Sequence, residues 1–223
     1  MKQGKEFDAT LLKPVLALER DPKTLKPVGD QVYQIYRHLY DYDPVPLDSQ
    51  VEEADPHWRR ERVSFRAAYG AERVPAHLFL PRNSPAPYQT VVFFPGSDAV
   101  ILPSSRDLSL QFLEFLHRSG RAVVYPVYQQ TYERHTNTSR TQSSLREISI
   151  QRGQDLRRAI DYLDTRPDID HSRIALYGLS LGAQLAPYTS PSNPARAPQF
   201  CCPVDSKPGR CRLKPILSTS RLE

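Results

Sequence analysis

The sequence is short of several features that mark specialised classes of protein. Cysteine is absent from residues 1–183, so cysteine content says nothing about the redox compartment of this part. No apolar run approaches the roughly 18 residues that a membrane helix requires, which excludes a membrane-spanning protein and a membrane partner. An early apolar run is split by Lys13-Pro14 and lacks a small-residue cleavage site, so we expect no export signal and a cytoplasmic location. What remains is 223 residues with 39% hydrophobic and 25% charged side chains, typical of one globular α/β domain with extensions.

The net charge of +5 is concentrated at the C-terminal end. Residues 1–183 contain 24 basic and 23 acidic side chains, whereas residues 184–223 contain 6 and 2. A nearly neutral body does not favour a nucleic-acid partner. Binding of nucleic acid through the basic end would have to show a salt-dependent affinity that disappears when residues 187–223 are deleted. We therefore expect no nucleic-acid partner.

Residues 187–223 differ in composition from the rest and are expected to form a disordered tail. Proline recurs there every three to seven residues, which blocks both helix and central strand. Three interpretations are open: a basic, proline-rich interaction arm, a metal site on Cys201, Cys202 and Cys211, or out-of-frame translation appended to a genuine domain. The cysteines lack paired Cys-x-x-Cys spacing and no histidine follows position 171, so we expect no metal and no other cofactor. We favour out-of-frame translation, because the composition changes in the middle of a motif that should continue.

The N-terminal part predicts little regular structure before a hairpin. Residues 1–60 are rich in Lys, Asp and Pro, and we expect a poorly ordered lead with one short helix at 32–40, where apolar residues share a helical face. A β-hairpin follows, with strands at 62–68 and 73–80 around a glycine turn. Pro75 cannot donate a ladder hydrogen bond, which favours an exposed or edge position for the second strand.

The next part of the chain predicts alternating strands and helices. A buried strand, a helix ending at a glycine and a second buried strand form a right-handed crossover, which makes the two strands parallel. After a polar loop at 127–143, a capping box at Ser144 opens a second helix. The fold class is therefore α/β, with an antiparallel hairpin followed by a parallel sheet with flanking helices and a disordered tail. The expected strands are 90–94, 121–126 and 173–177, and the expected helices are 107–119 and 144–165.

A Gly-x-Ser-x-Gly motif follows the third parallel strand, at Gly178, Ser180 and Gly182. The motif alone is a weak signal, but its position between a buried strand and a helix start matches a nucleophile elbow. Such a turn forces its serine into a positive-φ backbone so that Oγ projects above the sheet. The glycines supply room that a side chain would fill. We predict that Ser180 is the nucleophile; an ordinary serine in a tight turn is the alternative.

With these motifs the chain resembles the α/β-hydrolase family, in its dienelactone-hydrolase-like and acyl-peptidase-like esterase branch. The resemblance covers roughly residues 61–186. It is similar to hydrolase domains of large bacterial proteins, which lie behind a serine/threonine kinase or a formylglycine-generating-enzyme-like domain. The residues that carry it are 89–97, 120–128, 131–134, 161–170 and the motif at Ser180.

The resemblance implies an oxyanion hole made of two backbone N–H groups. In this family one comes from the loop after the first parallel strand, here Ser97, and the other from the residue after the nucleophile, here Leu181. Tyr132, Glu133 and Arg134 are expected to line the pocket, with a solvated loop as the alternative. The implied substrate is a small acyl ester, cleaved through an acyl-enzyme at Ser180.

The sequence departs from the family at the rest of the triad. In this fold the acid and the histidine follow the nucleophile, yet all six histidines precede Ser180 and only Asp205 and Glu223 follow it. His171 belongs to the far end of its strand, and His135 is the one histidine expected in a loop above the correct edge. We therefore interpret the chain as a truncated serine hydrolase with little or no turnover and an unpaired edge on its third parallel strand. A non-catalytic interaction module with a basic tail is the alternative.

Overall fold

The computed structural model describes residues 26, 29–55, 59–108, 110–137, 141–189 and 199–201. The chain divides into two compact units, residues 1–35 and 36–223. Helix α1 (Asp30–His38) begins in the first unit, and it confirms the short helix predicted near residues 32–40. None of its residues is buried. The predicted disorder of residues 1–25 lies outside the described residues.

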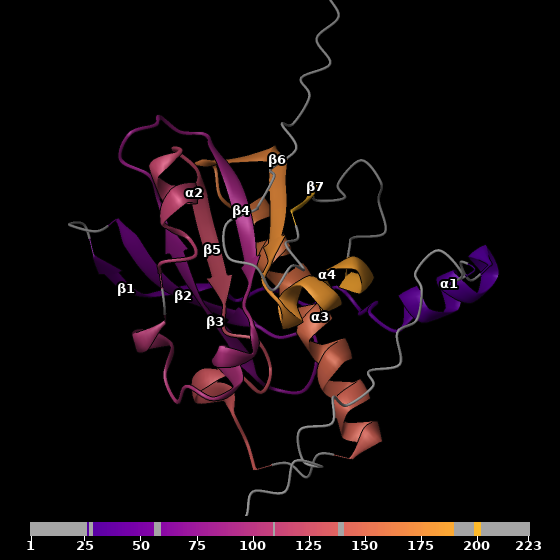
Figure 1. The fold of residues 1–223 in the computed structure, drawn as a ribbon. Coiled ribbons are helices and arrows are strands. Elements are labelled where there is room, and N and C mark those ends of the chain that lie inside the picture. The colour runs from indigo at the N-terminus through magenta and orange to yellow at the C-terminus, as the bar shows by residue number, and fades with distance from the viewer. Residues whose placement is uncertain are drawn as a thin grey trace, which may run out of the picture. The chain divides into compact units, whose positions relative to one another are not determined.

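The second unit is built on one seven-stranded sheet, whose strands lie side by side in Figure 1. The strand order is β1-β2-β3-β5-β4-β6-β7. β1, β2, β3 and β5 pair antiparallel, whereas β5, β4, β6 and β7 pair parallel. This topology confirms the predicted fold class. The strands are β1 (Gln50–Asp55), β2 (Arg60–Arg66), β3 (Arg73–Phe79), β4 (Tyr88–Phe94), β5 (Ala122–Pro126), β6 (Ile169–Gly178) and β7 (Gln199–Cys201).

The hairpin of β2 and β3 is present, with Gly70 in its turn at a φ of 55°. Two expectations for its surroundings are wrong. β1 pairs with the outer side of β2, and its mostly exposed residues lack the apolar alternation that would have predicted a strand. β3 is not an edge strand, since it pairs with β2 and with β5. Pro75 is tolerated because it precedes the residues paired with β5, and its carbonyl accepts a hydrogen bond from the Val127 N–H at 2.8 Å.

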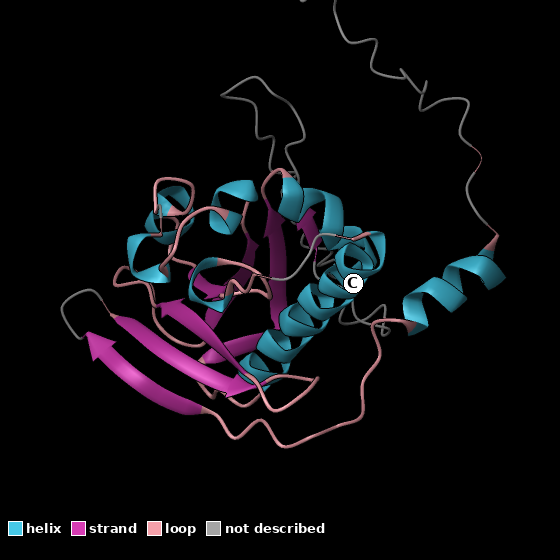
Figure 2. Ribbon diagram, turned by 90° about the horizontal axis from the view of Figure 1, so that it is seen from below, coloured by secondary structure: helices cyan, strands magenta, loops and turns pink. Residues whose placement is uncertain are grey.

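The central strands β4 and β5 are buried on both faces, as their continuous apolar runs predict. Alternate residues of β4 enter different cores: Val92 and Phe94 lie in one, Val91 and Phe93 in the other. The first core also contains Leu156 of the long helix α3 (Gln142–Asp164), which lies along the sheet in Figure 2. The short helix α2 (Glu114–Arg118) contributes to the second core. The sheet thus has helices on both sides, as a crossover topology requires.

The two predicted helices differ from the observed ones at their ends. The first is regular only over Glu114–Arg118, and the segment before it contains two 3₁₀ turns, Ser97–Val100 and Ser105–Asp107. α3 begins two residues earlier than predicted, because Thr141 and not Ser144 is its N-cap. The Thr141 side-chain oxygen accepts a hydrogen bond from the Ser144 N–H at 3.2 Å.

Parts of the expected tail form regular structure. Helix α4 (Leu181–Thr189) extends beyond residue 186, and β7 pairs parallel with β6 opposite Ala175, Leu176 and Tyr177. The expectation of disorder is therefore wrong for residues 187–189 and 199–201, and the edge of β6 is paired at these three positions. The reason is tertiary: an open strand edge offers backbone partners that no local pattern announces. Residues 190–198 and 202–223, including Cys202 and Cys211, lie outside the described residues.

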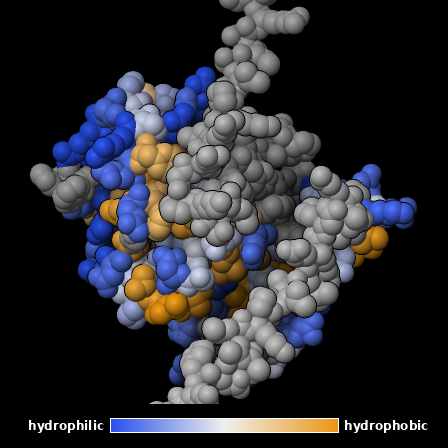
Figure 3. All heavy atoms as spheres, in the orientation of Figure 1, coloured by the Kyte–Doolittle hydropathy of each residue, from blue (hydrophilic) through white to orange (hydrophobic). Residues whose placement is uncertain are grey.

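The surface of the described part mixes polar and apolar side chains (Figure 3). Phe112 and Phe115 are among the exposed apolar residues, and orange spheres gather around α2 on the face shown. Of the helices in the described ranges, none combines the length and the apolar character needed to cross a bilayer.

Candidate active site

The turn after β6 places Ser180 where the sequence predicts it. β6 ends at Gly178, α4 begins at Leu181, and Ser180 between them has a φ of 49° and an exposed side chain. A left-handed backbone at a non-glycine residue is sterically unfavourable and persists only when surrounding structure enforces it. Two hydrogen bonds to the end of β4 do so: Leu179 N–H donates to Phe94 O at 2.9 Å, and Gly182 N–H donates to Pro95 O at 3.1 Å.

The two motif glycines permit this turn because neither position has room for a side chain. A Cβ on Gly178 would lie 2.8 Å from the Cα and the N of Ala183. A Cβ on Gly182 would lie 2.6 Å from the carbonyl carbon of Phe94 and 2.8 Å from Pro95 O. Real Cβ atoms essentially never approach backbone this closely. The glycines therefore let α4 start directly against the end of β4.

The loop after β4 lies beside Ser180. The position that a Cβ would take on Gly96 is 3.7 Å from Ser180 Cβ. Ser97 follows at the start of a 3₁₀ turn and is exposed. Within the described part of the chain, the N–H groups of Ser97 and Leu181 donate no hydrogen bond. Both N–H groups assigned by resemblance to the oxyanion hole thus lie just after the carboxyl ends of β4 and β6, at the start of the 3₁₀ turn and of α4, with their donors unengaged.

Asp98 is a neighbour of Ser180 that the sequence analysis did not single out. Its Oδ1 lies 3.0 Å from the same Cβ position on Gly96 that is 3.7 Å from Ser180 Cβ. Its carboxylate has no hydrogen bond or ion pair with another described residue. Its place directly after the predicted oxyanion residue was the signal that could have drawn attention to it.

The expected pocket residues Tyr132, Glu133 and Arg134 form a 3₁₀ turn that begins with a positive φ of 47° at Tyr132. The Tyr132 side chain is buried, and its hydroxyl is 2.6 Å from that of Tyr125. Burial raises the pKa of Tyr132 above its ordinary value, so the phenol is neutral. The preceding residues 127–131 are buried as well, whereas Glu133 is exposed, so the first part of the polar loop packs into the protein.

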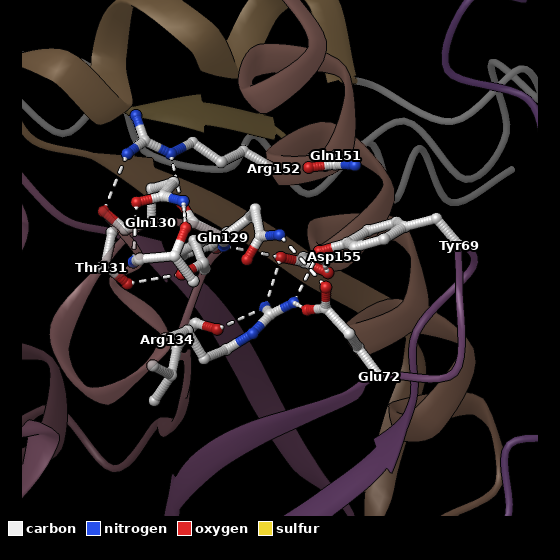
Figure 4. Close-up of polar contacts among 12 residues, drawn as sticks. Tyr69, Glu72, Gln129, Gln130, Thr131, Arg134, Gln151, Arg152 and Asp155 are labelled. Atoms are coloured by element: carbon white, nitrogen blue, oxygen red, sulfur yellow. Dashed lines mark hydrogen bonds and ion pairs between the residues drawn. The ribbon is translucent and has the colours of Figure 1, made fainter. Parts of the chain in front are cut away.

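Arg134 lies in an ion-pair cluster shown in Figure 4. Its guanidinium donates to Asp155 Oδ2 at 2.7 Å, to Glu72 Oε2 at 3.0 Å and to the Tyr69 hydroxyl at 2.6 Å. Asp155, on α3, is fully buried and also accepts hydrogen bonds from Tyr69 and from the Gln129 N–H. Burial raises the pKa of the Asp155 carboxyl even though these donors act in the opposite direction. The cluster joins the hairpin, the loop after β5 and α3.

Glu133, which is exposed, belongs to a second network with two buried residues, His77 of β3 and Ser105. Ser105 Oγ donates to Glu133 Oε1 at 2.8 Å, and Ser105 N–H donates to Oε2 at 2.8 Å. Since that hydroxyl proton is used, Ser105 Oγ accepts from His77 Nε2–H at 2.9 Å. Burial, aided by the charges of Arg60 and Arg62, lowers the pKa of His77 to about 4. Burial opposes ionisation of Glu133, but the Ser105 donors and Arg62 outweigh it and hold its pKa below the usual range.

No general base contacts Ser180 among the described residues. Its Oγ makes no hydrogen bond there, and no histidine ring is bonded to it. His135 is exposed in the loop after β5. His171 lies near the start of β6, at the far end of this strand from Ser180, and its Nε2 is 2.9 Å from Arg166 O. The described ranges also contain no group of three or more His, Cys, Asp or Glu residues that could hold a metal ion.

Comparison of the structure with known ones decides the fold. The chain is similar to acetyl xylan esterase 1 from Thermoanaerobacterium sp. JW/SL YS485, with a TM-score of 0.55 and 14% identity, over 73% of this chain and 55% of that one. An acetyl xylan esterase from Paenibacillus sp. R4 matches with a TM-score of 0.51 and 22% identity, over 75% and 56%. The glucuronoyl esterase from Solibacter usitatus matches with a TM-score of 0.50 and 14% identity, over 72% and 54%.

The fold is that of the α/β-hydrolases. At these identities the likeness establishes the fold alone, and it is partial, because the chain spans about half the length of these esterases. No protein-family model and no curated protein matches the sequence. The α/β-hydrolase fold places Ser180 at the carboxyl edge of the parallel strands, where open α/β sheets bind their ligands.

Proposed function

We propose that this chain carries the nucleophile and the oxyanion hole of a serine esterase. The observation that supports this most directly is the exposed Ser180 held at a φ of 49° between β6 and α4 of an α/β-hydrolase fold. The surrounding structure has to enforce this strained backbone, and a nucleophile requires it in order to project from the sheet toward a substrate. The substrate class is a small carboxylic ester. The dienelactone-hydrolase-like branch and the place behind upstream bacterial domains follow from the sequence resemblance only.

In the proposed reaction Ser180 Oγ forms a bond to the ester carbonyl carbon, and the carbonyl oxygen takes on negative charge. The amides of Ser97 and Leu181 donate to that oxygen, and each such donor lowers the barrier by about 3 kcal/mol in comparable hydrolases. The bond to the alcohol then breaks, the alcohol leaves with the proton of Ser180, and water hydrolyses the acyl-enzyme.

The proton of Ser180 needs a base, and the triad order of this fold puts that base after the nucleophile. No histidine follows Ser180 in this sequence. We therefore propose that the acid and the histidine belong to sequence not included in these 223 residues, and that the chain by itself turns over esters slowly or not at all. Loss of a triad member leaves only the part of catalysis that comes from the oxyanion hole and binding.

Labelling by a fluorophosphonate tests the nucleophile without requiring turnover. In this reaction Ser180 Oγ bonds to phosphorus, the P–F bond breaks, fluoride leaves and the hydroxyl proton passes to solvent. We expect slow modification confined to the Ser180 peptide, detected by mass spectrometry, and none in S180A. Circular dichroism establishes that both proteins are folded.

A non-catalytic interaction module is the second candidate, favoured by the absence of any hydrogen bond to Ser180 Oγ among the described residues. The same experiment separates the two. Absence of labelling in a folded sample supports the module and refutes the esterase proposal.

A further inference from the structure

The carboxylate of Asp98 is close to the nucleophile. The Cβ position on Gly96 lies 3.0 Å from Asp98 Oδ1 and 3.7 Å from Ser180 Cβ. Together these two lengths set an upper limit of about 7 Å on the distance from Asp98 Oδ1 to Ser180 Cβ. This limit is less than the Debye length of about 8 Å at physiological ionic strength. An acyl group bonded to Ser180 Oγ therefore starts within about one Debye length of the Asp98 charge.

Asp98 has no ion-pair partner among the described residues, in contrast to three charged residues of the loops at this edge. Glu133 pairs with Arg62 at 3.2 Å, and Arg134 pairs with Asp155 and with Glu72. Arg106, further along the same loop as Asp98, pairs with Glu53 at 2.7 Å. These pairs largely cancel their own fields. Asp98 forms no ion pair or hydrogen bond within the described residues, so its negative charge is not neutralised locally.

The charge of Asp98 also acts on two tyrosines, Tyr125 of β5 and Tyr132 of the loop after it. Tyr125 and Tyr132 share a buried hydroxyl pair, and the Asp98 charge adds to burial in raising the pKa of each phenol. Asp98 therefore acts on this tyrosine pair and lies near Ser180. Its backbone is fixed by the 3₁₀ turn, in which Asp98 O accepts from the N–H groups of Ile101 and Leu102.

We propose that Asp98 is a specificity-determining residue that makes Ser180 react faster with esters carrying a positive charge near the scissile bond than with esters carrying a negative one. The inference rests on the proposed esterase function of Ser180. For a ligand charge held about 7 Å from Asp98, Coulomb's law with a dielectric constant between 40 and 80 gives about a threefold to eightfold effect for each sign of charge. The cationic-to-anionic rate ratio is therefore expected to be roughly tenfold or more.

The test uses three fluorophosphonates of equal chain length that end in a trimethylammonium, a neutral methoxy or a carboxylate group. Labelling rates of Ser180 are measured by mass spectrometry for the unaltered chain and for D98N, D98K and D170N. We expect the cationic-to-anionic ratio to fall to within about twofold of unity in D98N and to invert in D98K. In the unaltered chain, raising NaCl from 10 mM to 500 mM should shrink the ratio, since screening weakens a field but not a steric contact.

D170N is the matched control because it makes the same change of charge at the far end of β6, roughly 25 Å from Ser180 at 3.3 Å per residue. It should keep the ratio of the unaltered chain. A ratio near unity in the unaltered chain, or one that D98N leaves intact, overturns the role of Asp98 while the esterase proposal stands. Absence of labelling by all three probes overturns both.

Discussion

Replacing Gly182 by alanine tests whether the turn at Ser180 depends on the contact between α4 and the end of β4. The new Cβ would lie 2.6 Å from the carbonyl carbon of Phe94 and 2.8 Å from Pro95 O, where van der Waals contact requires more than 3.4 Å. These atoms are backbone and cannot rotate away. They move only if the hydrogen bonds from Gly182 to Pro95 O and from Leu179 to Phe94 O lengthen. Overpacking of this kind typically costs 1–3 kcal/mol, and we expect about 3 kcal/mol because no side chain can absorb the strain.

The assay is urea unfolding followed by circular dichroism, with fluorophosphonate labelling of Ser180 in parallel. A loss of about 3 kcal/mol lowers the melting temperature of a chain this size by about 6–12 °C. Gly70→Ala is the control: its φ is 55°, but an added Cβ meets nothing within 4 Å, so only the left-handed backbone penalty of about 1 kcal/mol applies. Labelling should be lost in G182A and kept in G70A. Equal unfolding midpoints for G182A and the unaltered chain, with labelling intact, would refute the steric account of the turn.

Three other results are expected. The pKa of His77 is about 4 in the folded protein and about 6.5 in the unfolded chain, so its contribution of about 3 kcal/mol to the free energy of unfolding is complete above pH 6.5 and is lost as the pH falls toward 4. The urea midpoints measured at pH 7 and at pH 4.5 should therefore converge in H77Q. An unchanged pH dependence in H77Q would assign the loss of stability to other groups. Arg134→Met should lower the free energy of unfolding by about 3–5 kcal/mol because it leaves Asp155 charged and buried. The R134M/D155N double variant should be more stable than the sum of the two single changes predicts. Strict additivity of the free energies in denaturant unfolding contradicts this. Thr141→Ala removes the N-cap of α3 and should cost about 1 kcal/mol, a loss that T141S should largely restore; equal thermal stability of T141A and the unaltered chain would show that the cap contributes nothing.

The parts of the fold that follow from local pattern were predictable. The apolar runs of β4 and β5 fix two buried parallel strands, and the Gly-x-Ser-x-Gly spacing after β6 fixes a tight turn with Ser180 at positive φ. Elements without such a pattern were missed or misplaced. β1 is mostly exposed, β7 contains only three residues, and the N-cap of α3 lies at the first of two competing hydroxyl residues, Thr141 and Ser144.

The surroundings of Ser180 could be predicted only in part. Ser97 and Leu181 were identified by resemblance, whereas Asp98 was not, because its importance depends on the distance from Gly96 to Ser180 across two separate loops. Likewise, Glu133 and Arg134 were expected in the pocket, but the structure gives each an internal partner: Ser105 for one and Asp155 for the other. Pairings between residues 20 or more positions apart leave no periodic trace in a sequence.

The sequence by itself determined the alternation of strand and helix, the turn at Ser180 and the absence of a histidine beyond it, because each of these depends on neighbouring residues or on composition. Only the tertiary structure decided which charges are neutralised. Arg134, Glu133 and Asp98 look alike in a sequence as charged residues of loops. In the structure two are paired within the protein, whereas Asp98 lies near Ser180 without a partner among the described residues. The physical reason is that strand order brings distant loops to one edge of the sheet, and a charge acts through the distances and burial that this order creates.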